Sequence, residues 1–175
     1  KSKRSVSQLV KEQVIIPPLR RSDDAPEAGG MTRGTLFHKA MEWLDFGDVE
    51  NSLSRLEAMG VLRDFQDRDL VLNYFESDTL KEVHKNALGI DREVPFVWKL
   101  ETDEGIELIQ GVIDQVIRLP EGVVLVDFKS DNSYHYLESY KKQIELYAKA
   151  YEEITGQRVL KKLLWFARLG ETLEV

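Results

Sequence analysis

The first half of the chain has apolar residues at the spacing of amphipathic helices. In the segment 35–46 apolar residues recur three and four positions apart, which is the repeat of one helix face. The segments 50–59 and 66–87 are also predicted to be helical. The apolar positions are Leu36, Phe37, Ala40, Met41 and Leu44 in the first of these helices, and Leu70, Leu72, Tyr74, Phe75 and Leu80 in the third.

From residue 92 on, the pattern changes to runs rich in β-branched residues. Three such runs cover residues 92–100, 106–119 and 122–129. The turn signal "ETDEG" follows the first run, and "PEG" follows the second. Short turns of this kind connect neighbouring antiparallel strands, so the three runs are predicted to form an antiparallel meander.

A further helix and a further strand are predicted near the end of the sequence. Residues 136–156 have apolar positions along one helix face, and Gly156 suits the left-handed residue that commonly ends a helix. Residues 159–168 are predicted to form a strand. Because a helix separates this strand from the meander, the chain must cross over, and the last strand can lie parallel to a meander strand.

The order of the predicted elements indicates an α/β protein of αβββαβ type, with a mixed sheet flanked by helices and an extra N-terminal helical region. Residues 1–33 are expected to form a short helix at Ser5–Val14 and a loop or extended arm, since the segment 17–34 holds three prolines and three glycines. Residues 34–175 are expected to form the core, with a helical insert. The pattern shows no repeat, and a single domain over 1–175 is predicted.

Composition excludes several kinds of site. The 175 residues include no cysteine, which rules out disulfides, iron–sulfur clusters and thiolate zinc sites. We find neither an apolar run long enough for a membrane span nor a signal-peptide pattern, so a cytoplasmic protein is expected. The chain also lacks a G-x-x-x-x-G-K-[ST] loop, so we expect no nucleotide-driven motor in it. Because it begins at Lys1 without a methionine, we expect a piece of a longer protein.

Charge is distributed unevenly along the chain, whose net charge is −7. Residues 1–22 carry six Lys or Arg against one Glu, and residues 101–128 carry one Arg against seven Asp or Glu. An acidic middle attracts a divalent cation more readily than a phosphate backbone, although ordinary acidic solubility explains it equally well. The basic residues 1–22 are consistent with a DNA contact or with a linker to a preceding domain.

Two aspartates lie within neighbouring predicted strands. Asp114 has apolar neighbours, and a carboxylate there is costly unless it is paired or binds a metal. If the chain turns at Pro120 and Glu121, Asp114 faces Asp127 with about 5 Å between the β-carbons. Two such carboxylates and a backbone carbonyl suit Mg²⁺ or Mn²⁺. "PEG" suits a turn with a glycine bulge as well, which would shift the register by one and separate the two carboxylates.

Lys129 completes this group, because strand side chains alternate with a period of two and so place it on the same face as Asp127. An ammonium there could orient or deprotonate an attacking water, or stabilise charge that builds up on a phosphate. The plain alternative is a surface Asp–Lys pair at a fraying strand end. A second acid on the neighbouring strand favours the catalytic interpretation.

These segments together resemble a known family. "GVIDQV" and "VLVDFKSDN" are similar to the G-x-x-D and D-[YF]-K-[TS]-D motifs of RecB-like nucleases in the PD-(D/E)XK superfamily. "GTLFHKAMEWLDF" resembles the G-T-x-x-H helix of that family, "QIELYAKAY" its Q-x-x-x-Y motif, and "REVPF" also fits. The spacing and "SVSQL" look most like the C-terminal nuclease domain of an AddA-type helicase–nuclease subunit. The resemblance implies a restriction-endonuclease-like core.

The resemblance also implies roles for particular residues. By position in the motifs, Asp114 and Asp127 would be metal ligands, and the backbone carbonyl of Phe128 would be another. His38 would complete the metal site, although an isolated helix histidine is more often a core or surface residue. Lys129 would be the catalytic lysine.

Further residues take part in the comparison with the family. Gln143 and Tyr147 match the Q-x-x-x-Y pair, and their i, i+4 spacing puts both on one helix face, where they could bind a phosphate or brace the lysine. In some folds of this family a residue at the place of Glu93 reaches the site, but for Glu93 a salt bridge with a neighbour is the favoured expectation. His84 and His135 match no motif and are both expected at the surface.

The resemblance implies a metal-dependent DNA nuclease that takes part in recombinational repair, with Mg²⁺ or Mn²⁺ as cofactor and no iron–sulfur cluster. The implied substrate is single-stranded DNA delivered by a helicase motor during the processing of double-strand breaks. The implied partners are a helicase domain of the same parent chain and an AddB-type subunit, with no membrane. The alternative is a nuclease-like DNA-binding or scaffold domain without turnover.

Overall fold

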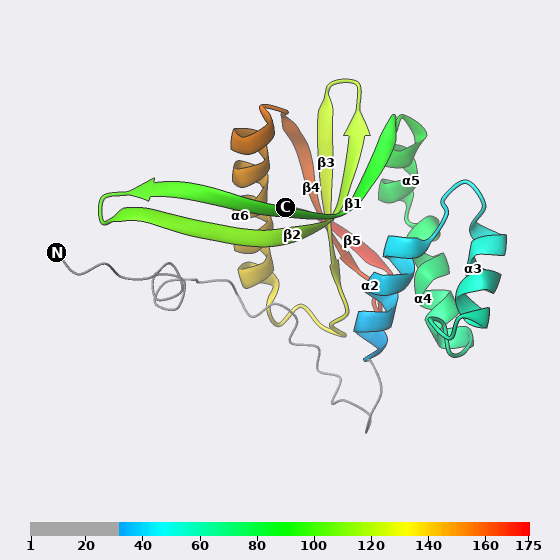
Figure 1. Cartoon of the computed structure of the whole chain (residues 1–175). Helices are drawn as coiled ribbons and strands as arrows, with labels where there is room; N and C mark the ends of the chain where they lie inside the picture. Colours follow the sequence, from blue (N-terminus) through cyan, green and yellow to red (C-terminus); the bar gives the residue numbers. More distant parts are fainter. Residues whose placement is uncertain (1–31) are drawn as a thin grey trace.

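The computed structural model describes residues 32–175 (Figure 1). The helix predicted at Ser5–Val14 and most of the predicted arm lie outside the described residues. The described region is a mixed sheet with helices on both faces, as the sequence predicted. None of the helices in this region is long and apolar enough to cross a lipid bilayer.

Within residues 32–175 four helices precede the sheet, and three of them begin at a side chain that caps their free N–H groups. They are α2 (Arg33–Trp43), α3 (Val49–Ala58), α4 (Phe65–Glu76) and α5 (Asp78–Lys85). The Thr32 side chain accepts a hydrogen bond from the Thr35 backbone and starts α2. The single helix predicted over 66–87 is in fact two, because the Ser77 side chain accepts a hydrogen bond from the Leu80 backbone and caps a new helix.

The sheet has five strands in the order β1-β2-β3-β4-β5 within the described residues. The strands are β1 (Gly89–Thr102), β2 (Gly105–Leu119), β3 (Gly122–Lys129), β4 (Val159–Phe166) and β5 (Glu171–Glu174). The predicted meander is confirmed, since β1, β2 and β3 pair antiparallel. The predicted parallel strand is confirmed as well, since β4 pairs parallel with β3.

Two features at the end of the chain connect and extend this sheet. The crossover helix α6 (Leu137–Thr155) joins β3 to β4, and it ends at Gly156, which has the expected left-handed φ of 72°. The short strand β5 was not predicted, because its four residues include two exposed glutamates and too few apolar positions to form a pattern.

The register between β2 and β3 decides the alternative that the "PEG" turn left open. Leu119 pairs with Gly122 and Gln115 pairs with Val126. The turn therefore has two residues, and the alternative register with a glycine bulge is wrong. The pairing ends just before Asp114, whose Oδ2 accepts a hydrogen bond of 2.7 Å from the backbone N–H of Phe128. The predicted pairing thus brings Asp114 beside the end of β3.

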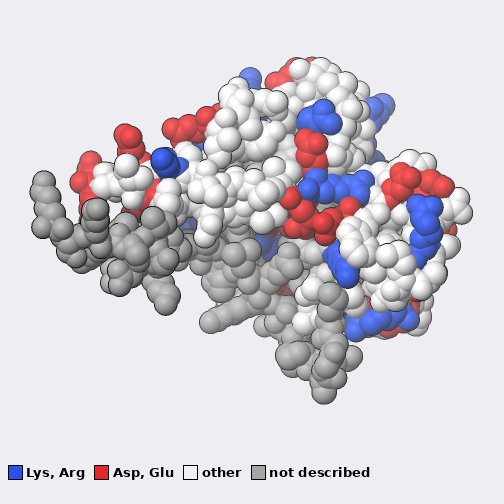
Figure 2. Space-filling model, in the orientation of Figure 1, with Lys and Arg blue, Asp and Glu red and all other residues white. Residues whose placement is uncertain are grey.

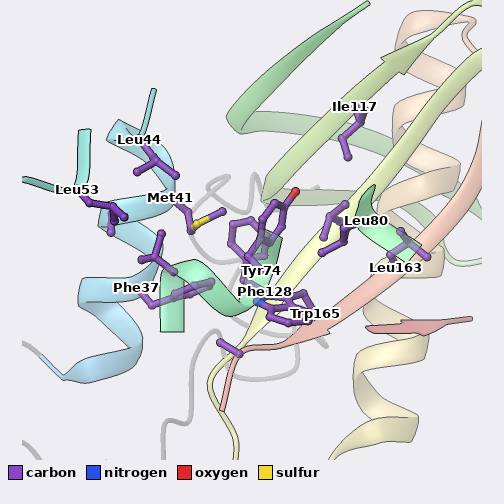
Figure 3. Packing of buried hydrophobic residues seen from close by; sticks show 14 of the residues in the cluster. Phe37, Met41, Leu44, Leu53, Tyr74, Leu80, Ile117, Phe128, Leu163 and Trp165 are labelled. Carbon is purple, nitrogen blue, oxygen red and sulfur yellow. The ribbon is translucent and has the colours of Figure 1, made fainter. Parts of the chain in front are cut away.

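The sheet separates two hydrophobic clusters. On one face, α2 to α5 pack against alternate residues of β3, among them Val126 and Phe128. Figure 3 shows this cluster, in which the Tyr74 ring makes edge contacts with Phe128 and Trp165 at centroid distances of 6.0 and 5.9 Å. On the other face α6 covers the intervening residues, such as Leu125. Each fully buried Val, Leu or Phe side chain contributes roughly 1.5–3 kcal/mol to stability.

An ion-pair group fixes the beginning of α2 on α4. The guanidinium of Arg33 lies 3.0 Å from the Asp64 carboxylate and 2.5 Å from the Asp67 carboxylate. Asp67 is almost fully buried and also accepts a hydrogen bond from the backbone of Arg63, so the Asp67 carboxylate has little access to water, whereas Asp64 is exposed. It holds in place the helix that carries His38.

Candidate active site

The predicted site residues surround one cavity, where α2 and α6 approach β2 and β3. The cavity has a volume of about 130 Å³. The predicted residues that line it are His38, Asp114, Asp127, Phe128, Lys129, Gln143 and Tyr147. The structure thus brings the whole predicted set together, while the chemical role of each member stays a prediction.

His38 and Asp114 form the centre of the site. The Nδ1 atom of the imidazole lies 3.1 Å from Oδ1 of Asp114, and both residues are buried. Burial opposes the ionisation of Asp114, but the facing His38, the N–H of Phe128 and the Lys129 ammonium together hold its pKa below the usual range. Asp114 is therefore a buried carboxylate kept ionised by its neighbours.

Glu93 belongs to the same group, a position that the resemblance allowed but that was ranked below a salt bridge with a neighbour. Its Oε1 lies 4.0 Å from Nδ1 of His38, and it lines the cavity. One ligand atom each from His38, Glu93 and Asp114 lie within 4.8 Å of one another. Its place in "REVPF" was the available sequence signal, but only the pairing of β1 with β2 shows where the carboxylate lies.

The backbone of Glu93 is strained. Its φ is +47°, the one positive value outside glycine in the described residues, although it lies within a strand. Arg92 pairs with Gln115 and Val94 pairs with Ile113, so the ladder is interrupted only at Glu93, opposite Asp114. Such a conformation costs of order 1–3 kcal/mol and is found mostly where function requires it.

Asp127 lies beside Asp114 and differs from it in electrostatics. Burial raises the pKa of Asp127 to about 6, the Asp114 carboxylate contributes in the same direction, and Lys129 opposes both effects. Two acids in one buried place rarely ionise together at low cost, so the pair divides into one ionised carboxylate and one that is more readily protonated. A bound cation would remove this repulsion.

Lys129 is held on three sides. Its Nζ lies 2.6 Å from Oδ2 of Asp127 and donates a hydrogen bond of 2.9 Å to Oε1 of Gln143. The Gln143 amide in turn donates to the Tyr147 hydroxyl at 3.1 Å. The ammonium also lies 4.1 Å from the centroid of the Tyr140 ring, a cation–π contact. Little freedom is left to the lysine, which suits a group that must act at a fixed point.

Tyr140 and Asp131 also line the site, although neither was predicted to be a site residue. The Tyr140 hydroxyl donates a hydrogen bond of 2.8 Å to Oδ2 of Asp131, and both residues line the cavity. Helical spacing could have found Tyr140, because it precedes Gln143 by three positions and so lies on the same face of α6. For Asp131 the signal was its place as the last residue of the D-[YF]-K-[TS]-D motif.

Two glycines in the motifs are required by close packing. A β-carbon on Gly34 would lie 2.4 Å from Oγ of Ser130, so α2 can approach the end of β3 only without one. A β-carbon on Gly111 would lie 2.9 Å from the Tyr147 ring. The glycines of "GTLFH" and "GVIDQV" therefore make room for the helices that carry His38 and Tyr147.

The two histidines outside the motifs differ in environment. His135 is exposed, as predicted. His84 is not a surface residue as expected, because it is half-buried on α5 and its Nε2 lies 2.6 Å from the hydroxyl of the buried Tyr74. The packing of α5 against α4, which creates this contact, had no signal in the motif comparison.

The donors at the cavity fit a hard divalent cation. Mg²⁺ and Mn²⁺ prefer carboxylate and carbonyl oxygens, and imidazole nitrogen is a common further ligand. His38, Glu93, Asp114 and Asp127 offer these atoms in a buried cavity. The like charges of the three carboxylates make a bound cation more favourable than an empty group of acids.

The chain is similar to known proteins of one family. Residues 14–173 match the PD-(D/E)XK nuclease superfamily. The chain is 30% identical over 174 residues to the A-type subunit of the ATP-dependent helicase/nuclease of Clostridium novyi (strain NT), covering 83% of this chain and 14% of that protein. It is 30% identical over 201 residues to the protein of the same description from Acetivibrio thermocellus, covering 95% of this chain and 16% of that protein.

The chain thus spans only a small part of the curated relatives that it matches. A crystal structure described as that of SSO0001 aligns with 87% of this chain and 69% of its own, with a TM-score of 0.39 and 14% identity. The family match covers nearly the whole chain, and the predicted αβββαβ architecture is present in the described residues. This chain belongs to the PD-(D/E)XK nuclease superfamily.

Proposed function

We propose that this chain is a Mg²⁺- or Mn²⁺-dependent deoxyribonuclease that hydrolyses phosphodiester bonds in DNA strands fed to it by a helicase. The observation that carries the proposal is the meeting of His38, Asp114, Asp127 and Lys129 at one buried cavity. Buried acids with a fixed ammonium beside them are the groups that metal-assisted phosphate hydrolysis requires. A domain of the same family without turnover would not need the lysine held in this way.

The cation would be held by His38, Asp114, Asp127 and the backbone carbonyl of Phe128, with Glu93 beside them. When bound, it supplies a Lewis acid for the scissile phosphate and lowers the pKa of an attacking water. Asp114 supports this role because its neighbours keep it ionised. His38, whose Nδ1 faces that carboxylate at 3.1 Å, orients it.

Lys129 would act on the phosphate itself. Its ammonium, held by Asp127 and Gln143, presents a positive charge beside the metal ligands, where negative charge develops on the phosphoryl oxygens. The hydrogen bond from Gln143 to Tyr147 fixes the amide that accepts from the lysine. Such preorganised contacts raise the rate because they need no rearrangement as the charge develops.

The surface charge supports delivery of the DNA by another domain. Acidic side chains gather at the end of the molecule where the β1–β2 hairpin projects, and elsewhere on the face in view Lys and Arg alternate with Asp and Glu (Figure 2). Since the chain carries a net charge of −7, bulk electrostatics would bind DNA weakly. A helicase domain in the parent chain and an AddB-type subunit would supply the strand, during processing of double-strand breaks for recombinational repair in the cytoplasm.

The test is cleavage of labelled single- and double-stranded DNA by the chain in Mg²⁺ or Mn²⁺, with EDTA as the metal-free control. Lys129→Ala should reduce the rate by about 10²-fold or more. Lys149→Ala is the matched control, because Lys149 is an exposed lysine on α6, and it should retain the rate. A Lys129→Ala variant as fast as the control would overturn the assignment.

If the unmodified chain cuts neither substrate, calorimetry with Mn²⁺ shows whether the metal site is present. Mn²⁺ binding that is lost in Asp114→Asn would keep the metal site and assign the missing activity to the absent motor. Activity should then return in the parent helicase–nuclease and be lost there on Lys129→Ala. Absence of Asp114-dependent Mn²⁺ binding would favour a scaffold domain instead.

A further inference from the structure

A second and larger cavity lies outside the active site. Its volume is about 650 Å³, against about 130 Å³ for the active-site cavity. It opens between the chain that follows α2, the helices α4 and α5, and the beginning of β1. We propose that this cavity binds one nucleotide, with the base against its aromatic wall and the phosphate at its cationic rim.

The wall of the cavity is centred on Phe46. Its ring lies 4.4 Å from the guanidinium carbon of Arg92 and makes an edge contact with Phe75 at a centroid distance of 5.3 Å. Both phenylalanines are half-buried, so part of each ring faces the cavity. Aromatic faces held in place by neighbours in this way favour a planar ring such as a nucleobase, whichever base it is.

The floor of the cavity is polar. The hydroxyl of the buried Tyr74 donates a hydrogen bond of 2.5 Å to Oε1 of Gln115 and lies 2.6 Å from Nε2 of His84. Because a phenol has one proton and Gln115 accepts it, His84 must donate from Nε2. The Nδ1 atom of His84 is then left as an acceptor for an N–H on the edge of a base. Burial lowers the pKa of His84, which supports this neutral form.

The rim of the cavity carries cations from two elements. Lys85, in the last turn of α5, is exposed and has no carboxylate within ion-pair distance among residues 32–175. Lys81 lies 3.3 Å from Glu76, and Asp45 at the same rim partly offsets Arg92. Lys85 is therefore the cation best able to hold a phosphate, which an ammonium does as a point charge.

The cavity lies at the opposite end of α2 from the active site. Gly34, Thr35 and His38 line the active site, whereas Asp45 and Phe46, which follow the helix, line the second cavity. The inference goes beyond the nuclease proposal and does not depend on it, since it rests on separate residues. A nucleotide can come from two sources, either one unit of a bound DNA strand or a free mononucleotide.

The experiment measures binding of two probes, 5′-dAMP and a fluorescein-labelled dA oligonucleotide, to the 175-residue chain carrying Lys129→Ala, in EDTA so that no cleavage occurs. Lys85→Glu and Phe46→Ala should each weaken binding at least about tenfold. Lys85→Arg keeps the positive charge and should bind the probes as the chain with Lys85 does. Lys149→Glu, on the exposed face of α6, makes the same charge change elsewhere and should have little effect.

The two probes separate the two sources. Tight binding of 5′-dAMP that competes with the oligonucleotide indicates a free nucleotide site, whereas binding of the oligonucleotide alone indicates a unit of a strand. Chemical-shift changes on probe addition should appear at residues 45–47 and on α5. If Lys85→Glu binds both probes as well as Lys149→Glu does, or if neither probe binds, the proposal is wrong. Because the active site is already disabled, this result is independent of the nuclease test.

Discussion

The Lys129 ammonium lies 2.6 Å from the carboxylate of Asp127, its neighbour two positions earlier on the same face of β3. The arrangement follows from strand geometry, because alternate side chains point the same way. The contact that fixes the lysine comes from α6, where Gln143 accepts a hydrogen bond from it at 2.9 Å. Strand and helix together set the position of the charge.

Gln143→Ala should therefore impair catalysis without impairing metal binding. Loss of the contact frees the ammonium, and we expect a fall in kcat of roughly tenfold to a hundredfold. The Mn²⁺ affinity from calorimetry should stay close to that of the unmodified chain, because Gln143 is not a predicted metal ligand. Lys142→Ala, at the preceding position on α6, serves as the control. An equal loss of affinity and rate would show instead that the metal site had collapsed.

The pKa of Asp127 predicts a pH dependence of stability. Because burial raises the pKa of Asp127 to about 6, above its ordinary value of 3.8, the folded chain binds more protons than the unfolded chain between these values. The contribution of Asp127 to the free energy of unfolding thus falls as pH rises from about 4 to about 6. Above that range the loss of stability is of order 2–3 kcal/mol.

Denaturant unfolding in EDTA at pH 4.5 and at pH 7 measures this effect. Asp127→Asn removes the titration, so the variant should gain stability relative to the unmodified chain on going to pH 7. Comparison of the two chains cancels the groups that they share. A difference that does not change with pH would show that Asp127 has an ordinary pKa.

Mn²⁺ binding should weaken below about pH 6, since the ligand must lose its proton.

Gly34→Ala tests the close approach of α2 to β3. Without the contact, alanine would stabilise a helix position by up to about 1 kcal/mol. Because the new β-carbon would lie 2.4 Å from Oγ of Ser130, we expect a loss of about 1–3 kcal/mol instead. The free energy of unfolding gives the sign. Adding Ser130→Gly should recover part of the loss, and strictly additive costs would refute the clash.

Glu93→Gly should separate stability from metal binding. Glycine adopts a φ of +47° without the strain that a glutamate has there, so the metal-free chain should gain roughly 1 kcal/mol. Mn²⁺ affinity should fall, because the carboxylate beside His38 is lost. Glu93→Gln keeps the backbone and should weaken Mn²⁺ binding with no gain in stability. If both variants bind Mn²⁺ normally, Glu93 is not near the ion.

Much of the site could be predicted because it depends on local repeats. The period of two in a strand joins Asp127 to Lys129, and the i, i+4 spacing of a helix joins Gln143 to Tyr147. The two aspartates on neighbouring strands followed from the short "PEG" turn, apart from one choice of register. The backbone pairing of Gln115 with Val126 made that choice.

The remaining features depend on contacts between segments far apart in the sequence. Glu93 reaches the group only because β1 pairs with β2 and α2 brings His38 to the same place, and its strained φ has no local signature. His84 is half-buried because α5 packs on α4 beside Tyr74, although its own sequence neighbours are mostly polar. The break at Ser77 and the short β5 were missed for local reasons instead, namely a single serine cap within a long apolar pattern and a strand too short to form a pattern.

Sequence periodicity thus predicted most of the strands and helices of this nuclease-family chain, and the family motifs identified the seven predicted residues that line the active-site cavity, because both depend on neighbours a few positions away. Tertiary packing alone established the β2–β3 register, the place of Glu93 beside His38, and the second cavity beside Phe46. These depend on how whole elements pack, which local spacing does not encode.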